Sequence, residues 1–284
     1  MATNKVETNR EPPLISVIVP TIGRASLILA LKSIHSQSYQ PIEVLIVCDH
    51  QLKDNQYILQ VAELSLVKVL YTSSGTASAN RNLGLLKARG DFVAFLDDDD
   101  VWYPEKLKLQ VASILSSGAN VICTRARYKG WKNEIVPKKV FNNDELFVIS
   151  LYDKWTFKPR NYGIPTPTLL VATKLAQKVL FDEKLSERED IWFIHNLQIL
   201  GARFCQIDEV LAEVSSTKPH TNRKVFMAQE IDWFMKLNQI SRNLGWKFLI
   251  TVSIRNCLLN FKILKALTLL SKALKVISIN ELFK

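Results

Sequence analysis

Four consecutive aspartates, Asp97 to Asp100, directly follow the apolar run Phe92–Leu96 in the segment GDFVAFLDDDDVWYPEKL. Adjacent carboxylates repel each other, and burying an unpaired anion is costly, so such a cluster needs a compensating positive charge. Mg²⁺ and Mn²⁺ bind oxygen ligands, and Mg²⁺ usually combines one or two carboxylates with substrate phosphates. Open α/β sheets bind their ligands outside the carboxyl ends of the strands. The segment therefore indicates a site for a metal and a phosphate, with a solvated acidic turn as the alternative.

The elements that must position this cluster are visible as alternating patterns. Short β-branched runs predict buried strands, and apolar residues at helical spacing predict amphipathic helices between them. This alternation predicts an α/β fold with a mostly parallel, twisted sheet flanked by helices. We expect strands at 14–20, 42–50, 66–73, 92–96, 119–128 and within 202–214, and helices at 26–37, 80–88, 105–115, from 189 or 190, and from about 225 to the end. The segment 129–167 is irregular and typical of a substrate-facing loop region.

The composition is that of an ordinary globular protein with a basic surplus. The chain has 284 residues, of which 48% are hydrophobic and 23% charged, and its formal net charge is +10. This charge predicts an anionic partner, namely a nucleic acid, a nucleotide or an acidic lipid surface. The basic residues are scattered and form no recognition motif, so we expect no nucleic acid. The four cysteines form no CxxC pair, which argues against a zinc knuckle and a disulfide scaffold.

The sequence also bears on localisation. The polar N-terminus, MATNKVETNREPP, is followed by no apolar segment of a secretion signal, and no stretch approaches the roughly 18 apolar residues of a membrane-spanning helix. We therefore expect a cytoplasmic protein. Association with the inner face of the membrane stays open, because the C-terminal segment is amphipathic.

Three segments in order resemble family 2 glycosyltransferases with the GT-A fold: SVIVPTIGRASLILALKSIHSQSYQPIEVLIVCDH, then SGTASANRNLGLLKARGDFVAFLDDDDVWYPEKL, then SEREDIWF. The resemblance covers about residues 14 to 220. It implies a Rossmann-like GT-A domain that binds a nucleotide-sugar, followed by a C-terminal helical extension. We expect a flexible tail over 1–13, a nucleotide-sugar-binding half over 14–115, an acceptor-binding and catalytic half over 116–224, and the helical extension over 225–284.

In that family a DxD motif holds a divalent metal that bridges the two phosphates of the donor. Mapped onto this sequence, the resemblance implies Mn²⁺ or Mg²⁺ bound by Asp99, with Asp97 as a second ligand and Asp97 or Asp98 facing the ribose or sugar. Asp100 is expected to cap the following turn. His220 lies where many relatives have a histidine near the metal or diphosphate, and simple exposure in a polar loop is its alternative.

Further residues match the family's nucleotide contacts. Pro20, Thr21 and Arg24 belong to the first loop, PTIGR, and Arg81 matches a residue near the base or diphosphate, where an arginine fork suits phosphate oxygens. Capping or surface solvation is the alternative for these residues. Asp49 matches an aspartate that reads the base, and a carboxylate can accept the imide N–H of uracil. The family's usual Asp-Asp-Gly is here CDH, at residues 48–50, which leaves the base preference open.

The segment SEREDIWF matches the family's ED motif, which implies Asp190 as the catalytic base and Glu189 as its neighbour. A sugar hydroxyl is a poor nucleophile until a base removes its proton. The N-terminus of a helix favours negative charge, so we expect Asp190 to stay ionised. A capping box formed by Ser186 and Glu189 is an alternative that explains Glu189 but not Asp190.

The C-terminal segment carries lysines and aliphatic residues at helical spacing. Its lysines at 262, 265, 272 and 275 fall on one side, and its leucines and isoleucines at 259, 263, 267, 270, 274 and 277 fall on the other. Such a stripe can pack on the catalytic domain, or it can lie in a membrane interface where lysines meet acidic lipid.

Together these features predict an inverting, metal-dependent glycosyltransferase. It would move a sugar from a nucleotide-sugar, for which a UDP-sugar is the first expectation, to a hydroxyl of a saccharide or lipid-linked acceptor. The reaction would belong to polysaccharide, glycolipid or glycoconjugate synthesis. A sugar-nucleotide nucleotidyltransferase is one alternative, although PTIGRASLI lacks that class's glycine-rich, basic signature. A non-catalytic nucleotide-sugar-binding or scaffold protein is another, against which the intact Asp97, Asp99 and Asp190 argue. The sequence leaves the oligomeric state open.

Overall fold

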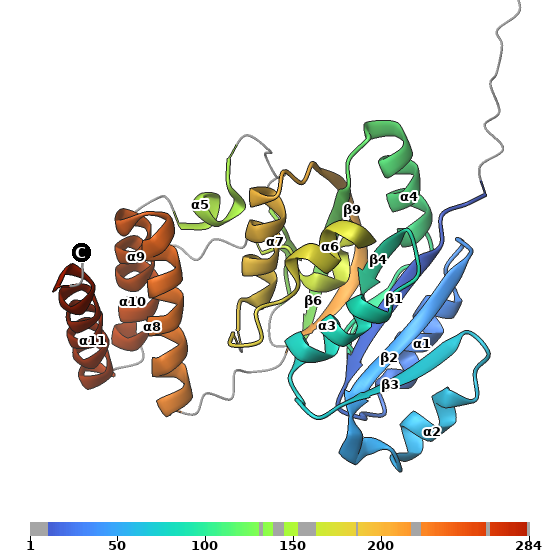
Figure 1. The fold of residues 1–284 in the computed structure, drawn as a ribbon, viewed down its shortest axis with the longest axis horizontal. Helices are drawn as coiled ribbons and strands as arrows, with labels where there is room; N and C mark the ends of the chain where they lie inside the picture. The colour runs from blue at the N-terminus through green and yellow to red at the C-terminus, as the bar shows by residue number, and fades with distance from the viewer. Residues whose placement is uncertain are drawn as a thin grey trace, which may run out of the picture.

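The computed structural model describes residues 11–130, 133–138, 145–152, 163–185, 187–216, 223–259 and 262–282. Figure 1 shows a sheet covered by helices and, to one side of it, a bundle of C-terminal helices. The sheet has the strand order β3-β2-β1-β4-β8-β6-β9-β5, and β7 pairs with β6 off this path.

The first half of the sheet is parallel. It consists of β1 (Ile15–Thr21), β2 (Ile42–Asp49), β3 (Val67–Thr72) and β4 (Phe92–Phe95). All seven residues of β1 are buried, as expected for a strand between two parallel neighbours. The pairing places Thr21 opposite Cys48, so the carboxyl ends of these strands share one edge. The aspartate cluster, which follows β4, therefore lies at that edge.

The second half of the sheet is mixed. It contains β5 (Val101–Trp102), β6 (Val121–Gly130), β7 (Ile135–Val136), β8 (Leu170–Ala172) and β9 (Phe204–Ser216). β8 runs antiparallel to both β4 and β6, whereas β6 and β9 are parallel. The expected α/β fold is confirmed, but the parallel order runs without interruption only through the first half of the sheet. Residues 202–214 contain a single strand, β9, and not two.

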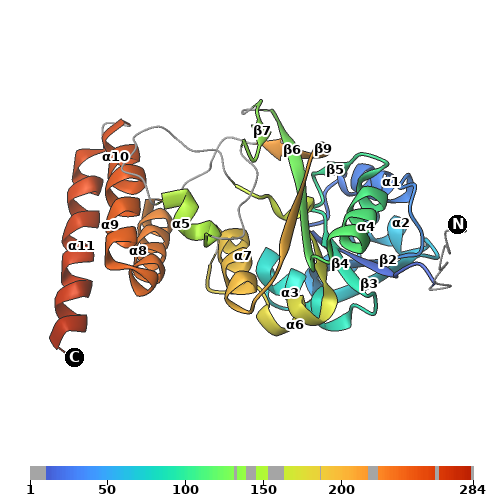
Figure 2. The same ribbon diagram turned by 90° about the horizontal axis from the view of Figure 1, so that it is seen from above.

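Helices cover both faces of the sheet (Figure 2). One face packs against α1 (Leu27–His35), α2 (Gln56–Ala62) and α4 (Lys106–Ser117). The other packs against α3 (Ala77–Lys87), α6 (Thr173–Val179) and α7 (Glu189–Ile199). Neighbouring residues of β1 alternate between the two apolar cores: Val17 belongs to the first and Ile18 to the second.

A glycine sets the distance between α3 and β1. A Cβ added at Gly84 would lie 2.5 Å from Cγ2 of Ile18, closer than two carbons can approach. The missing side chain therefore lets α3 lie directly against β1, and this packing places Arg81, one turn earlier in α3, over the end of the sheet.

The C-terminal extension is helical, as predicted. It consists of α8 (Arg223–Ile240), α9 (Arg242–Phe248), a π-helical segment η3 (Leu249–Ile254), α10 (Arg255–Leu259) and α11 (Ile263–Leu282). A third apolar core, with Trp233, Phe234 and Phe248 among its buried members, also contains Leu185 from the segment before α7. Within the described residues, no helix has the length and apolar character needed to cross a bilayer.

Several short elements escape the sequence-based expectation. They are α2, α5 (Phe147–Tyr152), α6, η1 (His50–Leu52), η2 (Thr166–Thr168) and the strands β5, β7 and β8. Each has at most seven residues, too few for a hydrophobic period to stand out. The expected tail over 1–13 falls largely outside the described residues, which begin at Glu11.

Candidate active site

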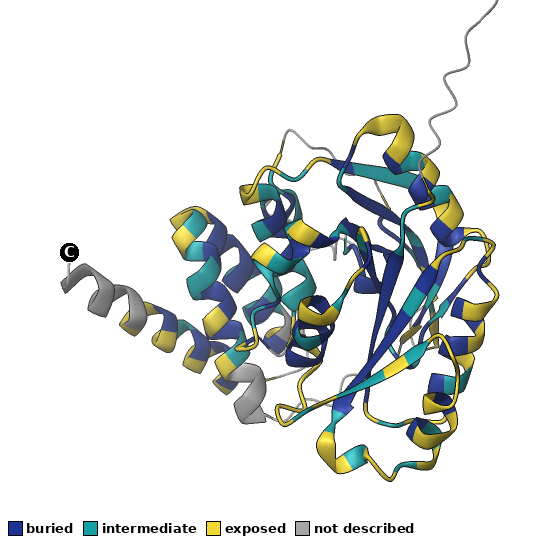
Figure 3. Ribbon diagram, turned by 45° about the vertical axis from the view of Figure 1, so that its right-hand side comes forward, coloured by how far each residue is buried: buried dark blue, intermediate teal, exposed yellow. Residues whose placement is uncertain are grey.

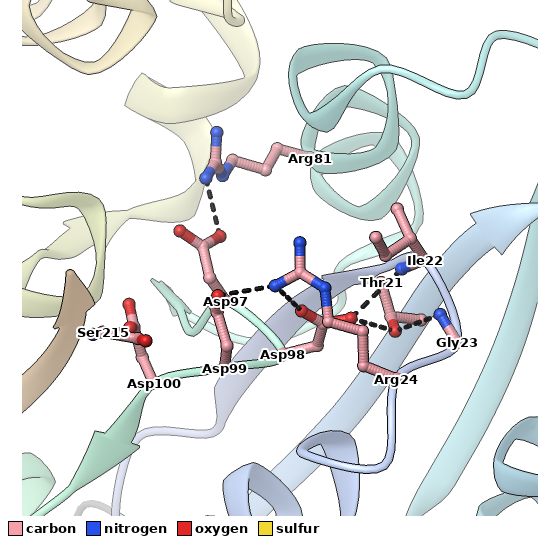
Figure 4. A network of polar contacts seen from close by, with 10 residues as sticks. All are labelled: Thr21, Ile22, Gly23, Arg24, Arg81, Asp97, Asp98, Asp99, Asp100 and Ser215. Atoms are coloured by element: carbon pink, nitrogen blue, oxygen red, sulfur yellow. Dashed lines mark hydrogen bonds and ion pairs between the residues drawn. The ribbon is translucent and has the colours of Figure 1, made fainter. Parts of the chain in front are cut away.

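The four aspartates after β4 have different partners: Asp98 and Asp99 contact the first loop, Asp97 contacts α3, and Asp100 contacts β9 (Figure 4). Asp98 and Asp100 are buried, whereas Asp97 and Asp99 are partly exposed. The cluster is therefore not a uniformly solvated turn, and the charge of each member must be balanced locally.

Asp98 fixes the first loop to the end of β4. Its Oδ2 accepts a hydrogen bond of 2.6 Å from the hydroxyl of Thr21 and one of 3.1 Å from the backbone N–H of Ile22. The Thr21 hydroxyl also accepts the N–H of Gly23, which has a φ of +77°. Asp98, expected to face the donor, is thus largely engaged in holding the loop.

Asp99 pairs with Arg24, which comes from the same first loop. Nη1 of Arg24 lies 2.5 Å from Oδ2 of Asp99 and 3.3 Å from Oδ1 of Asp98. Burial raises the pKa of Asp99; Arg24 opposes this rise, and the charges of Asp98 and Asp97 add to it. Burial and the two neighbouring carboxylates together therefore outweigh the single arginine.

Arg81 bridges two carboxylates from distant parts of the chain. Its Nη2 lies 2.6 Å from Oδ1 of Asp97, and its Nη1 lies 3.0 Å from Oε1 of Glu189 at the start of α7. The guanidinium is only 3% exposed, and although burial acts to lower the pKa of Arg81, the charges of Asp97 and Glu189 raise it. The arginine expected near the base or diphosphate therefore ties β4 to α7.

Asp100 is buried against β9. Its Oδ1 accepts a hydrogen bond of 2.7 Å from the backbone N–H of Ser215. Burial and the charge of Asp97 raise the pKa of Asp100 to about 9, so this carboxyl is protonated at neutral pH. The expectation that Asp100 caps the next turn is wrong, because α4 begins at Lys106 with Glu105 as its N-cap residue.

Asp190 is a partly buried residue in the first turn of α7. Burial and the charge of Glu189 raise its pKa to about 7, while the N–H of Ile191, at 2.8 Å, acts in the opposite direction. We expected the helix N-terminus to keep Asp190 ionised, but desolvation outweighs the helix dipole. The capping-box alternative is also wrong, because the N-cap residue of α7 is Arg188; Ser186 lies outside the described residues.

Asp49 ends β2 and caps the short helix η1. Its Oδ1 accepts the backbone N–H of Gln51 at 2.8 Å. Its Oδ2 faces Gly75, where an added Cβ would lie 3.3 Å away. Gly75 lines a cavity at this edge of the sheet, so Asp49 lies beside that cavity.

Two cavities meet at the aspartate cluster. The first hollow, of about 280 Å³, is lined by Pro20, Thr21, Ile22, Arg24, Gly75, Ala77, Asn80, Arg81, Asp97, Asp98, Asp99 and Glu189. The second hollow, of about 320 Å³, is lined by Arg81, Asp97, Asp100, Tyr128, Pro165, Thr166, Pro167, Glu187, Arg188, Glu189, Asp190 and Val214. Asp97, Arg81 and Glu189 line both.

The two hollows bring together most of the residues selected from the sequence. Pro20, Thr21, Arg24, Arg81 and the aspartates 97 to 99 line the first, and Asp190 lines the second. Asp49 lies just outside the first. His220 lies outside the described residues, within which no group of three or more His, Cys, Asp and Glu side chains is arranged as a metal site.

Sequence reasoning missed several residues that line these hollows. Asn80 is buried, and its Oδ1 has no hydrogen-bond partner among the described residues, so a ligand in the first hollow could satisfy it. Its position directly before Arg81 in SANRNLG was the available signal. No local motif marks Tyr128 and Arg188, because only the folding of the chain brings them to the second hollow.

The arrangement has clear chemical consequences. The first hollow offers arginine, hydroxyl and amide groups beside exposed carboxylates, which suits a polar, phosphate-bearing ligand, with or without a cation. The second offers Asp190, whose pKa near neutrality suits acceptance of a proton from a bound hydroxyl. A group bound at the boundary would be in reach of both.

Comparisons with known proteins agree with this chemistry. Residues 16–176 match the family described as Glycosyl transferase family 2. The amylovoran biosynthesis glycosyltransferase AmsB of Erwinia amylovora is 27% identical over 216 residues, which are 69% of this chain and 68% of AmsB. The UDP-Glc:alpha-D-GlcNAc-diphosphoundecaprenol beta-1,3-glucosyltransferase WfgD of Escherichia coli is 37% identical over 109 residues, 37% of this chain and 42% of WfgD.

Solved structures share the fold. TarS of S. aureus in complex with UDP-GlcNAc has a TM-score of 0.61 at 21% identity, covering 86% of this chain and 72% of that one. The mannosyltransferase PcManGT from Pyrobaculum calidifontis, in complex with GDP-Man and Mn²⁺, has a TM-score of 0.56 at 16% identity, covering 93% and 76%. The chain therefore has the mixed α/β architecture of GT-A glycosyltransferases.

The contact between Thr21 and Asp98 can be tested by substitution. Thr21→Val keeps the shape of the side chain but leaves the buried Asp98 without its hydroxyl donor, so we expect the free energy of unfolding to fall by about 1–3 kcal/mol. Urea denaturation measures this change. Thr21→Ser keeps the hydroxyl and serves as the control; equal stability of the two variants would contradict the role given to the bond.

Proposed function

This chain belongs to glycosyltransferase family 2, and on that basis we propose that it moves a sugar from a nucleotide-sugar to a hydroxyl of a saccharide acceptor, with inversion at the anomeric carbon. The observation that supports this proposal is the pair of hollows that share Asp97, Arg81 and Glu189. Asp98 and Asp99 line only the first hollow, and Asp190 lines only the second. The donor would occupy the first hollow and the acceptor the second.

The first hollow suits a nucleoside diphosphate. Arg24 is 45% exposed and held by Asp99, so it can exchange this carboxylate for a phosphate oxygen. The amide oxygen of Asn80 can accept a hydrogen bond from the ligand. Asp49, which lies beside Gly75, would accept the imide N–H of uracil, and TarS, which shares the fold, was solved with UDP-GlcNAc. We therefore take a UDP-sugar as the first donor to test.

The aspartates are compatible with a divalent cation. Mg²⁺ and related ions commonly need only one or two protein carboxylates when the substrate supplies phosphate oxygens. Burial, and to a smaller extent the charges of Asp98 and Asp97, raise the pKa of Asp99 despite Arg24, and a bound cation would favour its ionised form. Asp99, with Asp97, would hold Mn²⁺ or Mg²⁺, and His220 is a further candidate ligand. When bound, the ion would stabilise negative charge on the departing nucleotide.

Asp190 is the proposed base. It is partly buried, it lines only the second hollow, and its pKa of about 7 lets it take up the proton of an acceptor hydroxyl at neutral pH. The hydroxyl oxygen would then attack the anomeric carbon from the side opposite the nucleotide, which gives inversion in one displacement. The ion pairs of Arg81 with Asp97 and Glu189 would hold the first turn of α7 and the end of β4 in a fixed position relative to each other.

The acceptor is proposed to be a saccharide, linked to lipid or part of a growing polysaccharide. The carboxylates around the second hollow accept hydrogen bonds, which suits the hydroxyls of a sugar. AmsB acts in amylovoran biosynthesis, and the name of WfgD specifies a diphosphoundecaprenol-linked acceptor. The alternatives of a nucleotidyltransferase and of a non-catalytic scaffold lack comparable support, because family membership and the complete set of acidic side chains favour glycosyl transfer.

We further propose that α11 contacts an anionic membrane surface from the cytoplasmic side. Ile263, Leu264, Leu267 and Leu274 are each more than half exposed, while α11 packs through Ala266, Leu269 and Ala273. Figure 3 shows exposed and buried positions alternating along the C-terminal helix. Thus part of the aliphatic stripe remains uncovered. Residues 233–280 contain no Asp or Glu and eight basic residues: Lys236, Arg242, Lys247, Arg255, Lys262, Lys265, Lys272 and Lys275. Exposed leucines beside lysines suit a bilayer interface.

The pH dependence of turnover tests the base. Because the deprotonated form of Asp190 is the active one and its pKa is about 7, kcat/KM should be constant above about pH 8 and fall about tenfold per pH unit below about pH 6. Asp190→Asn should lower kcat by about 10²–10⁴-fold. Release of UDP from UDP-sugars in the presence of Mn²⁺ and candidate saccharides measures both.

Binding of UDP by the Asp190→Asn protein provides the control, since Asp190 does not line the first hollow and the affinity should be unchanged. Wild-type turnover by Asp190→Asn would contradict the assignment of the base. Failure of the wild-type protein to turn over any nucleotide-sugar with any saccharide would contradict the proposed function itself.

Flotation with lipid vesicles tests the membrane contact. Vesicles of phosphatidylcholine with anionic phosphatidylglycerol should retain the protein at low salt and release it as salt rises, while pure phosphatidylcholine should retain much less. Leu264→Ser/Leu267→Ser should weaken the binding. The matched control is Leu29→Ser/Leu86→Ser, which replaces two exposed leucines outside the extension. Equal binding of the two double variants would show that α11 is not the contact surface.

A further inference from the structure

The segment that precedes Glu189 and Asp190 is held by the C-terminal extension. Arg188, directly before Glu189 and Asp190, has a φ of +63°, in the left-handed region that residues other than glycine rarely adopt. Its carbonyl accepts the N–H of Trp192 at 3.1 Å, which is an early hydrogen bond of α7. The conformation of Arg188 therefore sets the direction in which α7 begins, and the surroundings must hold it there.

The side chain of Arg188 reaches into the extension. Its Nη2 lies 2.6 Å from Oε1 of Glu230 in α8, and its guanidinium lies 5.1 Å from the ring centre of Phe248 in α9. Glu230 is 1% exposed, and its other oxygen accepts the hydroxyl of Ser253 in the π-helical segment η3. The chain of contacts thus runs from the start of α7 through α8 to η3.

A second contact supports the same segment from its other end. Nζ of Lys236, in α8, lies 2.6 Å from Oδ2 of Asp182 and 4.4 Å from the ring centre of Trp192. Leu185 is buried in the apolar core of the extension. The residues between α6 and α7 are therefore held at both ends by one helix, α8.

We propose that Glu230 and Arg188 are positioning residues that set the location of Asp190, so that the C-terminal extension is part of the catalytic unit. This inference rests on the function proposed above. The family match ends at residue 176, before Glu189, Asp190 and the C-terminal extension. Placement matters because a displacement of about 1 Å at a reacting group can lower a rate by about a hundredfold.

The test is Glu230→Gln, which keeps the size of the side chain and its bond to Ser253 but removes the charge that holds Arg188. We expect kcat to fall about 10- to 100-fold while the affinity for UDP and the KM for the donor stay unchanged. Amide hydrogen exchange over residues 189–192 should become about tenfold faster, because a charge-assisted hydrogen bond has been lost. Ser253→Ala, which removes the outer support alone, should act in the same direction with a smaller effect.

The matched control is Glu43→Gln. Glu43 also binds an arginine and a serine hydroxyl, through Arg89 and Ser16, but it lies on β2, away from both hollows. A purely structural role for Glu230 predicts that both variants lose stability and retain kcat. Such a result, with unchanged exchange over 189–192, would overturn the proposal. The exchange measurement needs no turnover. It therefore tests the positioning role even if the proposed function proves wrong.

Discussion

The site depends on how the carboxylates gathered at the end of β4 are neutralised. Arg81 is central to this, because its buried guanidinium binds Asp97 of this cluster on one side and Glu189, at the start of α7, on the other. Removing this arginine would leave two partly buried anions facing each other, a strongly unfavourable arrangement. The same contact joins the parallel half of the sheet to α7. It therefore fixes the boundary between the two hollows and the relative placement of Asp99 and Asp190.

The other carboxylates differ from one another in protonation and in their hydrogen-bond partners. Asp100 is neutral at pH 7 because burial and Asp97 raise its pKa to about 9, whereas Asp98 is held by Thr21 and Ile22. Asp99 keeps an exposed arginine as its partner and is the member with charge to offer a ligand. Asp190 lines the second hollow, and its pKa is raised to about 7. The cluster thus anchors neighbouring segments through Asp97, Asp98 and Asp100, while Asp99 and Asp190 are the proposed metal ligand and base.

Sequence reasoning found the parts of this site that local pattern determines. The run LISVIVP and the aspartates after Phe92–Leu96 mark strand ends that parallel pairing must bring to one edge. It could not find partners that the fold brings together over long separations. Glu189 is 108 residues from Arg81, and Ser215 is 115 residues from Asp100. Nor could it predict the mixed half of the sheet, because β5, β7 and β8, whose pairings are antiparallel, have two or three residues each and are too short for a recognisable period.

Calorimetric titration of the protein with UDP tests the central claim most directly, namely that the surplus of negative charge at Asp97 and Asp99 is balanced by a cation shared with a diphosphate. The account predicts that Mn²⁺ strengthens UDP binding at least about tenfold, equivalent to about 1.4 kcal/mol, relative to the same titration in EDTA. Asp99→Asn should lose most of that gain. An affinity that is the same with Mn²⁺ and with EDTA would contradict the account.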